Sequence, residues 1–160
     1  MYQAGQAGGQ ALVLARDSDN SAAALLYLNR QNANGESVVF RKNGSTVGNI
    51  SVTASTTSYN TSSDYRLKEN VVPIDGATDR LKALKPSRFN FIVDPEKTVD
   101  CFIAHEVQEV VPEAVTGEKD GEDMQAMDAA KLVPLLTAAL QEALGKIEQL
   151  EIRIAALEAN

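Results

Sequence analysis

The chain has 160 residues and a net charge of −7, which suits one medium domain or two small ones. An acidic chain without clustered Lys and Arg lacks the charge that binds a phosphate backbone, so we expect no nucleic-acid partner. No apolar run is long enough to cross a bilayer, so we expect no membrane association.

Residues 1–62 are rich in Gly, Ser, Thr, Asn and Ala. Short alternating runs over residues 37–42 and 49–54 predict strands. Turns are predicted at Asn34-Gly35 and Asn43-Gly44, because these residue types tolerate a positive φ. We therefore expect strands and turns with too little core to stand alone, and the alternative is a flexible polar tail.

Residues 64–125 predict a compact mixed α/β unit. Its expected elements, in chain order, are a helix over 77–85, a strand over 88–93, a buried strand over 101–104, a short helix over 105–111 and a hairpin turn over 119–122. Pro86 and Pro112 should end the two helices, because proline lacks the amide that a helix interior needs.

Residues 126–160 carry a heptad repeat. Position a is occupied by Val133, Leu140, Ile147 and Ile154, and position d by Leu136, Ala143, Leu150 and Leu157. A seven-residue repeat needs a partner along its seam, so the pattern predicts a left-handed coiled coil whose helix begins near Pro134. Charges that flank the seam, such as Glu142, are expected in solvent. The alternative is an amphipathic helix packed on its own domain.

β-branched residues at a with Leu at d favour parallel dimers. The heptads by themselves therefore predict an oligomer and do not predict a trimer.

The single cysteine, Cys101, excludes an internal disulfide and a zinc site built from cysteines. Its apolar neighbours Val99, Phe102 and Ile103 predict a buried thiol that acts as a small apolar side chain.

Candidate chemistry is sparse when residue types alone are considered. Ser63-Asp64 predicts a helix or turn cap, and His105, the sole histidine, is of a kind that is more often structural than catalytic. The carboxylates near it show no metal-ligand spacing and are expected on a solvated face; these are Asp100, Glu106 and Glu109. We expect no metal and no cofactor.

The segment Thr61-Ser62-Ser63-Asp64-Tyr65-Arg66-Leu67-Lys68-Glu69-Asn70 resembles a known cleavage-site signature. It is the signature of the phage intramolecular chaperone family, a self-cleaving serine peptidase domain at the C-termini of endosialidase tailspikes, neck appendages and L-shaped tail fibres. Further similarity lies in residues 47–52 with 59–61, residues 102–112 and residues 131–136. The resemblance covers about residues 25–160, and its motifs are specific in combination.

This resemblance implies an α+β homotrimer with three parts. Residues 1–63 would be the end of a β-rich trimeric fibre, residues 64–125 the chaperone core, and residues 126–160 the coiled-coil helix. The upstream fibre of the same chain, typically a triple β-helix or β-prism, would be the folding client, because such topologies nucleate slowly and misassemble.

A coiled coil would gather three chains and raise the local strand concentration. Cleavage would then release the chaperone fragment and make the stability of the fibre kinetic. The mature fibre would belong to the virion tail, after assembly in the host cytoplasm.

The family pattern implies a Ser–Lys pair, Ser63 and Lys68, with the cut between Ser63 and Asp64. A lysine acts as a general base where burial or a nearby cation lowers its pKa. His105 lies in the family's central block, where many members carry Gln, and is a further catalytic candidate.

The ring sizes leave the nucleophile open. Ser63 attacking its own carbonyl would close a strained four-membered ring, whereas attack on the Ser62 carbonyl would cut one bond earlier. Two routes give the expected cut. Ser63 of one chain attacks a neighbour's bond in trans, or the Asp64 carboxylate attacks the Ser63 carbonyl through a six-membered ring, with Lys68 or His105 managing protons.

The alternative function is a non-cleaving trimerisation and receptor-tip module of a tail fibre. An intact Ser63-Asp64 signature favours the self-cleaving form. A polysaccharide depolymerase of such a protein would lie upstream of these residues.

Overall fold

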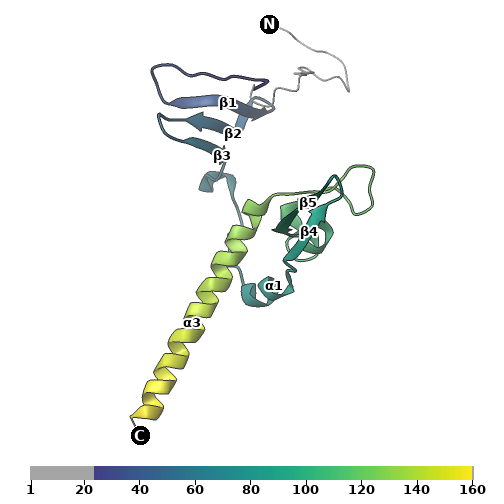
Figure 1. Ribbon diagram of the computed structural model, residues 1–160. Helices are drawn as coiled ribbons and strands as arrows, with labels where there is room; N and C mark the ends of the chain where they lie inside the picture. The colour runs from purple at the N-terminus through teal and green to yellow at the C-terminus, as the bar shows by residue number, and fades with distance from the viewer. Residues whose placement is uncertain (1–23, 160) are drawn as a thin grey trace. The chain divides into compact units, whose positions relative to one another are not determined.

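The computed structural model describes residues 24–159 (Figure 1). The chain divides into two compact units, with the boundary between Asn70 and Val71. The predicted cleavage point between Ser63 and Asp64 lies inside the first unit. Residues 1–23 of the predicted fibre end lie outside the described residues, and the three-part division by function stays a prediction.

The first unit contains a three-stranded antiparallel sheet in the order β1-β2-β3. Its strands are β1 (Gly35–Lys42), β2 (Ser45–Val52) and β3 (Thr57–Thr61). Asn43 and Gly44 join β1 to β2 with φ of 49° and 82°, the left-handed conformation that the turn prediction required. The strand pairing excludes a flexible tail over residues 35–61.

The two faces of this sheet differ in chemistry. Val38, Ile50 and Tyr59 occupy one row of the register, so their side chains share a face. On the polar side, Asn49 Nδ2 donates to Glu36 Oε1 at 2.7 Å, and Asn60 Nδ2 donates to Asn49 Oδ1 at 2.7 Å. No side chain among residues 24–70 is buried, which agrees with the prediction of too little core.

The second unit has a small core built from many short elements. These are α1 (Ala77–Ala83), β4 (Ser87–Phe91), β5 (Asp94–Cys101), α2 (Ala104–Gln108), η2 (Pro112–Ala114), β6 (Val115–Thr116), β7 (Ala126–Met127), η3 (Ala129–Leu132) and α3 (Val133–Glu158). The predicted helices near 77–85 and 105–111 are confirmed as α1 and α2. The predicted turn over 119–122 lies in the loop between the paired strands β6 and β7.

One contiguous cluster buries the apolar side chains of this unit. Its members are Ala77, Leu84, Val107, Val111, Ala114, Val115, Leu132, Leu135 and Ala139. They come from α1, the region of α2 and η2, and the start of α3, so segments that are distant in sequence meet in one core. The molecule is therefore mixed α/β, with small antiparallel sheets and a long C-terminal helix.

The predicted buried strand over residues 101–104 is wrong. β5 ends at Cys101 and α2 begins at Ala104, and the Cys101 thiol is exposed. The physical reason is that β4 and β5 form a two-stranded ribbon, which is not covered by a second sheet. Phe102, the next residue, packs against the core in place of Cys101.

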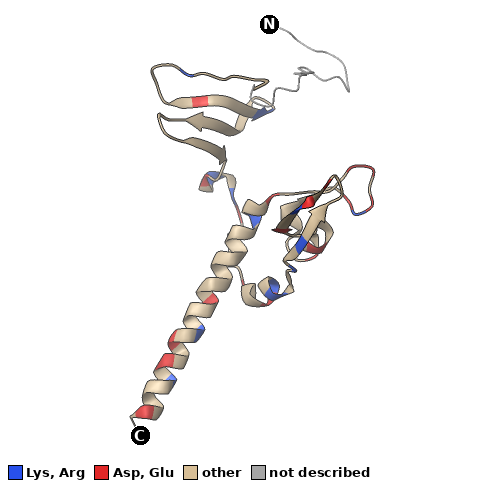
Figure 2. Cartoon of the chain, in the orientation of Figure 1, with Lys and Arg blue, Asp and Glu red and all other residues tan. Residues whose placement is uncertain are grey.

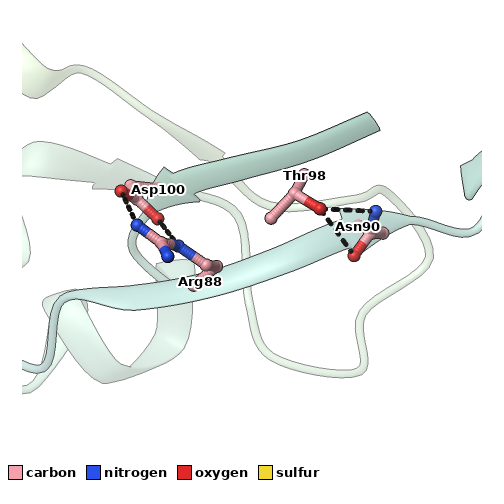
Figure 3. A network of polar contacts seen from close by, with 4 residues as sticks. All are labelled: Arg88, Asn90, Thr98 and Asp100. Carbon is pink, nitrogen blue, oxygen red and sulfur yellow. Dashed lines mark hydrogen bonds and ion pairs between the residues drawn. The ribbon is translucent and has the colours of Figure 1, made fainter. Parts of the chain in front are cut away.

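The β4–β5 ribbon also has a polar face (Figure 3). Arg88 binds both carboxylate oxygens of Asp100, at 2.6 and 2.9 Å, and Asn90 donates to Thr98 at 3.1 Å. The hydrogen bonds from Arg88 lower the pKa of Asp100 below its ordinary value. This face is solvated, because the Arg88 and Asp100 side chains are both exposed.

Helix α3 uses two of its faces differently. Leu135 and Ala139 are buried in the core of the second unit. The seven large side chains at the a and d positions point elsewhere and are each at least 47% exposed. The helix thus packs on its own unit, as the alternative prediction held, but it does so without using the heptad seam.

The C-terminal half of α3 contributes no buried side chain to the core of the unit. Every side chain from Lys146 to Glu158 is exposed, and this half extends beyond the rest of the second unit in Figure 1. Acidic and basic residues are distributed along it (Figure 2), as is usual beside a coiled-coil seam.

Candidate functional site

The chain turns sharply directly after β3. Residues Tyr65–Leu67 form the 3-10 turn η1, and Asp64 is its N-cap. The Arg66 amide donates to Asp64 Oδ1 at 2.9 Å, and the Lys68 amide donates to the Tyr65 carbonyl at 3.0 Å. The cap predicted from residue types alone is therefore present.

The turn brings Lys68 back to Ser63. Lys68 Nζ donates a hydrogen bond to Ser63 Oγ at 2.9 Å, and both residues are exposed in the single chain. A neutral amine at the same position would accept the hydroxyl proton, which is the contact that a general base requires. The two residues of the expected Ser–Lys pair are thus adjacent, and their catalytic roles stay predictions.

Arg66 occupies the carboxylate of Asp64. Its Nε donates to Asp64 Oδ1 at 2.9 Å and its Nη2 donates to Oδ2 at 2.7 Å, a two-pronged geometry that only a guanidinium provides. The side-chain hydrogen bond from Arg66, then its backbone hydrogen bond and the charge of Lys68, lower the pKa of Asp64. Asp64 also raises the pKa of Arg66, so both groups are charged at neutral pH.

His105 lies in α2 of the second unit and is half-buried. Its catalytic role stays a prediction. The neighbouring carboxylates have ordinary surface partners: Asp100 pairs with Arg88, and Glu106 pairs with Lys85 at 3.2 Å.

The described residues hold neither a cluster of metal ligands nor a membrane-spanning helix. Over residues 24–159, no group of three or more His, Cys, Asp or Glu side chains could hold a metal ion. In the same part of the chain, no helix combines the length and hydropathy of a membrane span.

Glu142 was expected in solvent; it is half-buried, and the prediction missed its hydrogen bonds to the start of α1. Its carboxylate accepts from the Ala77 amide at 2.8 Å, from the Thr78 amide at 2.9 Å and from the Thr78 hydroxyl. Gly76, the N-cap of α1, has no side chain to supply this acceptor, so Glu142 of α3 satisfies the first amides of α1. The hydrogen bonds from Thr78 and then Ala77 lower the pKa of Glu142.

Comparison with known proteins assigns this segment. Residues 63–116 match the model of a peptidase family described as the chaperone of endosialidase. These residues are thus similar to that family, which supports an endosialidase-type chaperone domain in this part of the chain. The match starts at Ser63 and ends in β6, so it covers η1, α1, the β4–β5 ribbon and α2. No curated protein sequence matches the chain.

The family supports an intramolecular chaperone role in the context of a phage tail fibre, carried out by a serine peptidase-like domain. Helix α3 lies outside the matched residues.

Proposed function

We propose that this chain is the C-terminal intramolecular chaperone of a phage tail fibre or tailspike. It forms a homotrimer, guides folding of the β-rich chain that precedes it, and releases itself by a cut between Ser63 and Asp64. Folding takes place in the host cytoplasm, and the mature fibre becomes part of the virion tail. The observation that carries the proposal is the 2.9 Å contact between Lys68 Nζ and Ser63 Oγ at the first residue of the family match.

The proposed oligomer interface is the a/d seam of α3. Its large side chains, such as Ile147 and Leu150, are each at least 47% exposed in the single chain, so burying the exposed half of each would contribute roughly 1 kcal/mol. A neighbouring face, formed by the c and g positions, is already used by the core through Leu135 and Ala139. In this proposal the heptads supply association, and three chains are taken, as the family resemblance implies, over the two that the pattern alone favours.

The proposed nucleophile is the Ser63 hydroxyl. Both carboxylate oxygens of Asp64 are engaged by Arg66, which argues against attack by Asp64 on the Ser63 carbonyl. Since a serine cannot attack its own carbonyl without a four-membered ring, Ser63 of one copy acts on the Ser63–Asp64 bond of a neighbouring copy.

The proposed cleavage reaction requires Lys68 in its neutral amine form. Ser63 Oγ adds to the neighbour's carbonyl carbon, and the hydroxyl proton passes to Lys68 Nζ. The C–N bond then breaks, Lys68 gives the proton to the leaving Asp64 amine, and an ester joins the two chains. Water hydrolyses this ester, which restores the Ser63 hydroxyl and leaves a carboxylate at the cut end.

Intact-mass spectrometry on the freshly expressed chain, beside Ser63→Ala and Lys68→Arg, tests the proposal. Arginine keeps the positive charge but does not act as a base at neutral pH. We expect a fragment that begins at Asp64 from the wild type. We expect no such fragment from either variant. A fragment that begins at Ser63 would show attack on the Ser62 carbonyl and overturn the assigned bond.

Mixing experiments test the trans route. Ser63→Ala chains co-expressed with wild-type chains should be cut within mixed trimers, because the wild-type Ser63 supplies the nucleophile. Uncut Ser63→Ala chains in such trimers would exclude this route.

The second candidate function is a non-cleaving trimerisation module at the fibre tip. It is favoured by the local role of the signature, because Asp64 caps η1 while Arg66 and Lys68 remain exposed. A single uncut species in the wild type, with the trimer intact, would support this function.

A further inference from the structure

We propose that Arg66 is a positioning residue for the cut: by occupying the Asp64 carboxylate, it leaves Lys68 free to serve Ser63. The inference rests on the proposed self-cleavage and deepens it. It assigns a role to a side chain that contacts neither the hydroxyl nor the amine of the Ser–Lys pair.

The Ser63–Lys68 pair has little other support. In the described part of the chain, the Ser63 hydroxyl and the Lys68 amine are hydrogen-bonded only to each other, and both residues are exposed. Their separation is therefore set by η1, which is only three residues long. The one side-chain cap of this turn is Asp64.

Arg66 and Lys68 are two cations that compete for the carboxylate of Asp64. Lys68 Nζ already reaches Ser63, the residue directly before Asp64, and its charge contributes to lowering the pKa of Asp64, so Asp64 and Ser63 compete for the same amine. Arg66 binds both Asp64 oxygens, at 2.9 and 2.7 Å. A guanidinium is always charged and its fork fits a carboxylate, so it competes better than an ammonium for this site.

Removing the Arg66 guanidinium would change the partner of Lys68. Without Arg66, the charged partner that remains beside Asp64 is Lys68, and an ion pair between them would draw the amine away from the Ser63 hydroxyl. A carboxylate partner also favours the charged form of a lysine, whereas the cut needs the neutral form. Loss of Arg66 should therefore slow the cut and move its pH dependence to higher pH.

The test uses the full-length chain and four variants: Arg66→Ala, Arg66→Lys, Asp64→Asn and the double variant Arg66→Ala/Asp64→Asn. Arg41→Ala, on exposed β1 of the same unit, is the matched control. The rate of appearance of the Asp64 fragment is measured by intact mass from pH 6 to pH 10, and the oligomeric state is measured by light scattering.

We expect Arg66→Ala to lower the rate at neutral pH by about 10- to 100-fold, the scale of a small misplacement of reacting groups, and to shift the pH midpoint upward. Arg66→Lys should give an intermediate rate, because lysine keeps the positive charge but cannot bind both carboxylate oxygens of Asp64 at once. Arg41→Ala should match the wild type, and the oligomeric state should not change in any of these chains.

The double variant separates this role from simple support of the fold. Asparagine is still a good N-cap but has no charge to attract Lys68, so Arg66→Ala/Asp64→Asn should return the pH midpoint to that of Asp64→Asn alone. An Arg66→Ala chain with the wild-type rate and midpoint would overturn the inference while leaving self-cleavage intact. A double variant that keeps the upward shift would overturn it as well, and an uncut wild type would overturn both proposals.

Discussion

The three-stranded sheet of the first unit and the core of the second unit bury their apolar side chains in different ways. The sheet is a single layer whose Phe40 and Tyr59 remain 52% and 79% exposed. In the second unit, Val107 and Val111 are each 1% exposed. The second unit thus buries apolar side chains within the chain, whereas the sheet leaves large side chains exposed, as the proposed association of chains would require.

Helix α3 combines both modes in one element. Its first turns contribute Leu135 to the core, and its later turns present a seam with no partner in the same unit. Folding of the second unit therefore uses one face of α3 and leaves the heptad face exposed for the proposed association of chains.

The largest expected effect comes from separating the units. A fragment of residues 71–160 should unfold cooperatively on heating, because it contains the whole buried cluster. A fragment of residues 24–70 should be unfolded, since a single-layer sheet without burial does not offset the entropy of ordering its chain. Circular dichroism and amide chemical-shift dispersion measure both outcomes. Cooperative unfolding of the 24–70 fragment alone would break the comparison.

A charge in the heptad seam should have the next largest effect. Ile147→Asp places a carboxylate at position a and should weaken the oligomer by about 100-fold or more in its apparent dissociation constant. Ile152→Asp is the matched control, because Ile152 is 70% exposed and lies outside the a and d positions. Sedimentation equilibrium measures both, and equal weakening by the two variants would show that the seam is not the interface.

Two adjacent leucines separate folding from association. Leu135 is 2% exposed and Leu136 is 47% exposed. Leu135→Ala should lower the free energy of unfolding by about 3 kcal/mol at every protein concentration. Leu136→Ala should lower the Tm more at low concentration than at high concentration, because it weakens association. Thermal melts of both variants over a 100-fold dilution series measure these effects. The same concentration dependence of the Tm in both variants would contradict the use of separate helix faces for folding and association.

The smallest effect concerns the capping of α1 by Glu142. Its hydrogen bonds with Thr78 and Ala77 hold its pKa below the ordinary value of 4.5. The unfolded chain therefore takes up this proton first as the pH falls, so the stabilisation is present above about pH 4.5 and is lost as the pH falls through the lower folded value.

Glu142→Gln should lower the Tm at pH 7 by roughly 2–5 °C, and the difference from the wild type should shrink at pH 3. Glu148→Gln, at an exposed position of the same helix, should leave both values unchanged. A difference that stays constant from pH 7 to pH 3 would show that the carboxylate charge is not what stabilises this cap.

The site itself was predictable only in part. The cap at Asp64 and the turn at Asn43-Gly44 follow from local residue types, since each depends on neighbours in the chain. The approach of Lys68 to Ser63 depends on the direction of η1, and the engagement of Asp64 by Arg66 depends on a side-chain conformation. Neither is contained in a residue pattern, and the resemblance to a family supplied the pair before the geometry was known.

The sequence by itself determined the local elements: the alternating strands, the helix that stops before Pro86, and the heptads of α3. Local signals suffice there because propensity and periodicity act within a few residues. Only the tertiary structure decided which face of α3 meets the core, why Cys101 is exposed, and that Glu142 caps a helix far away in sequence. These outcomes depend on long-range packing, where a side chain's partner is set by how separate elements meet and not by its neighbours in the chain.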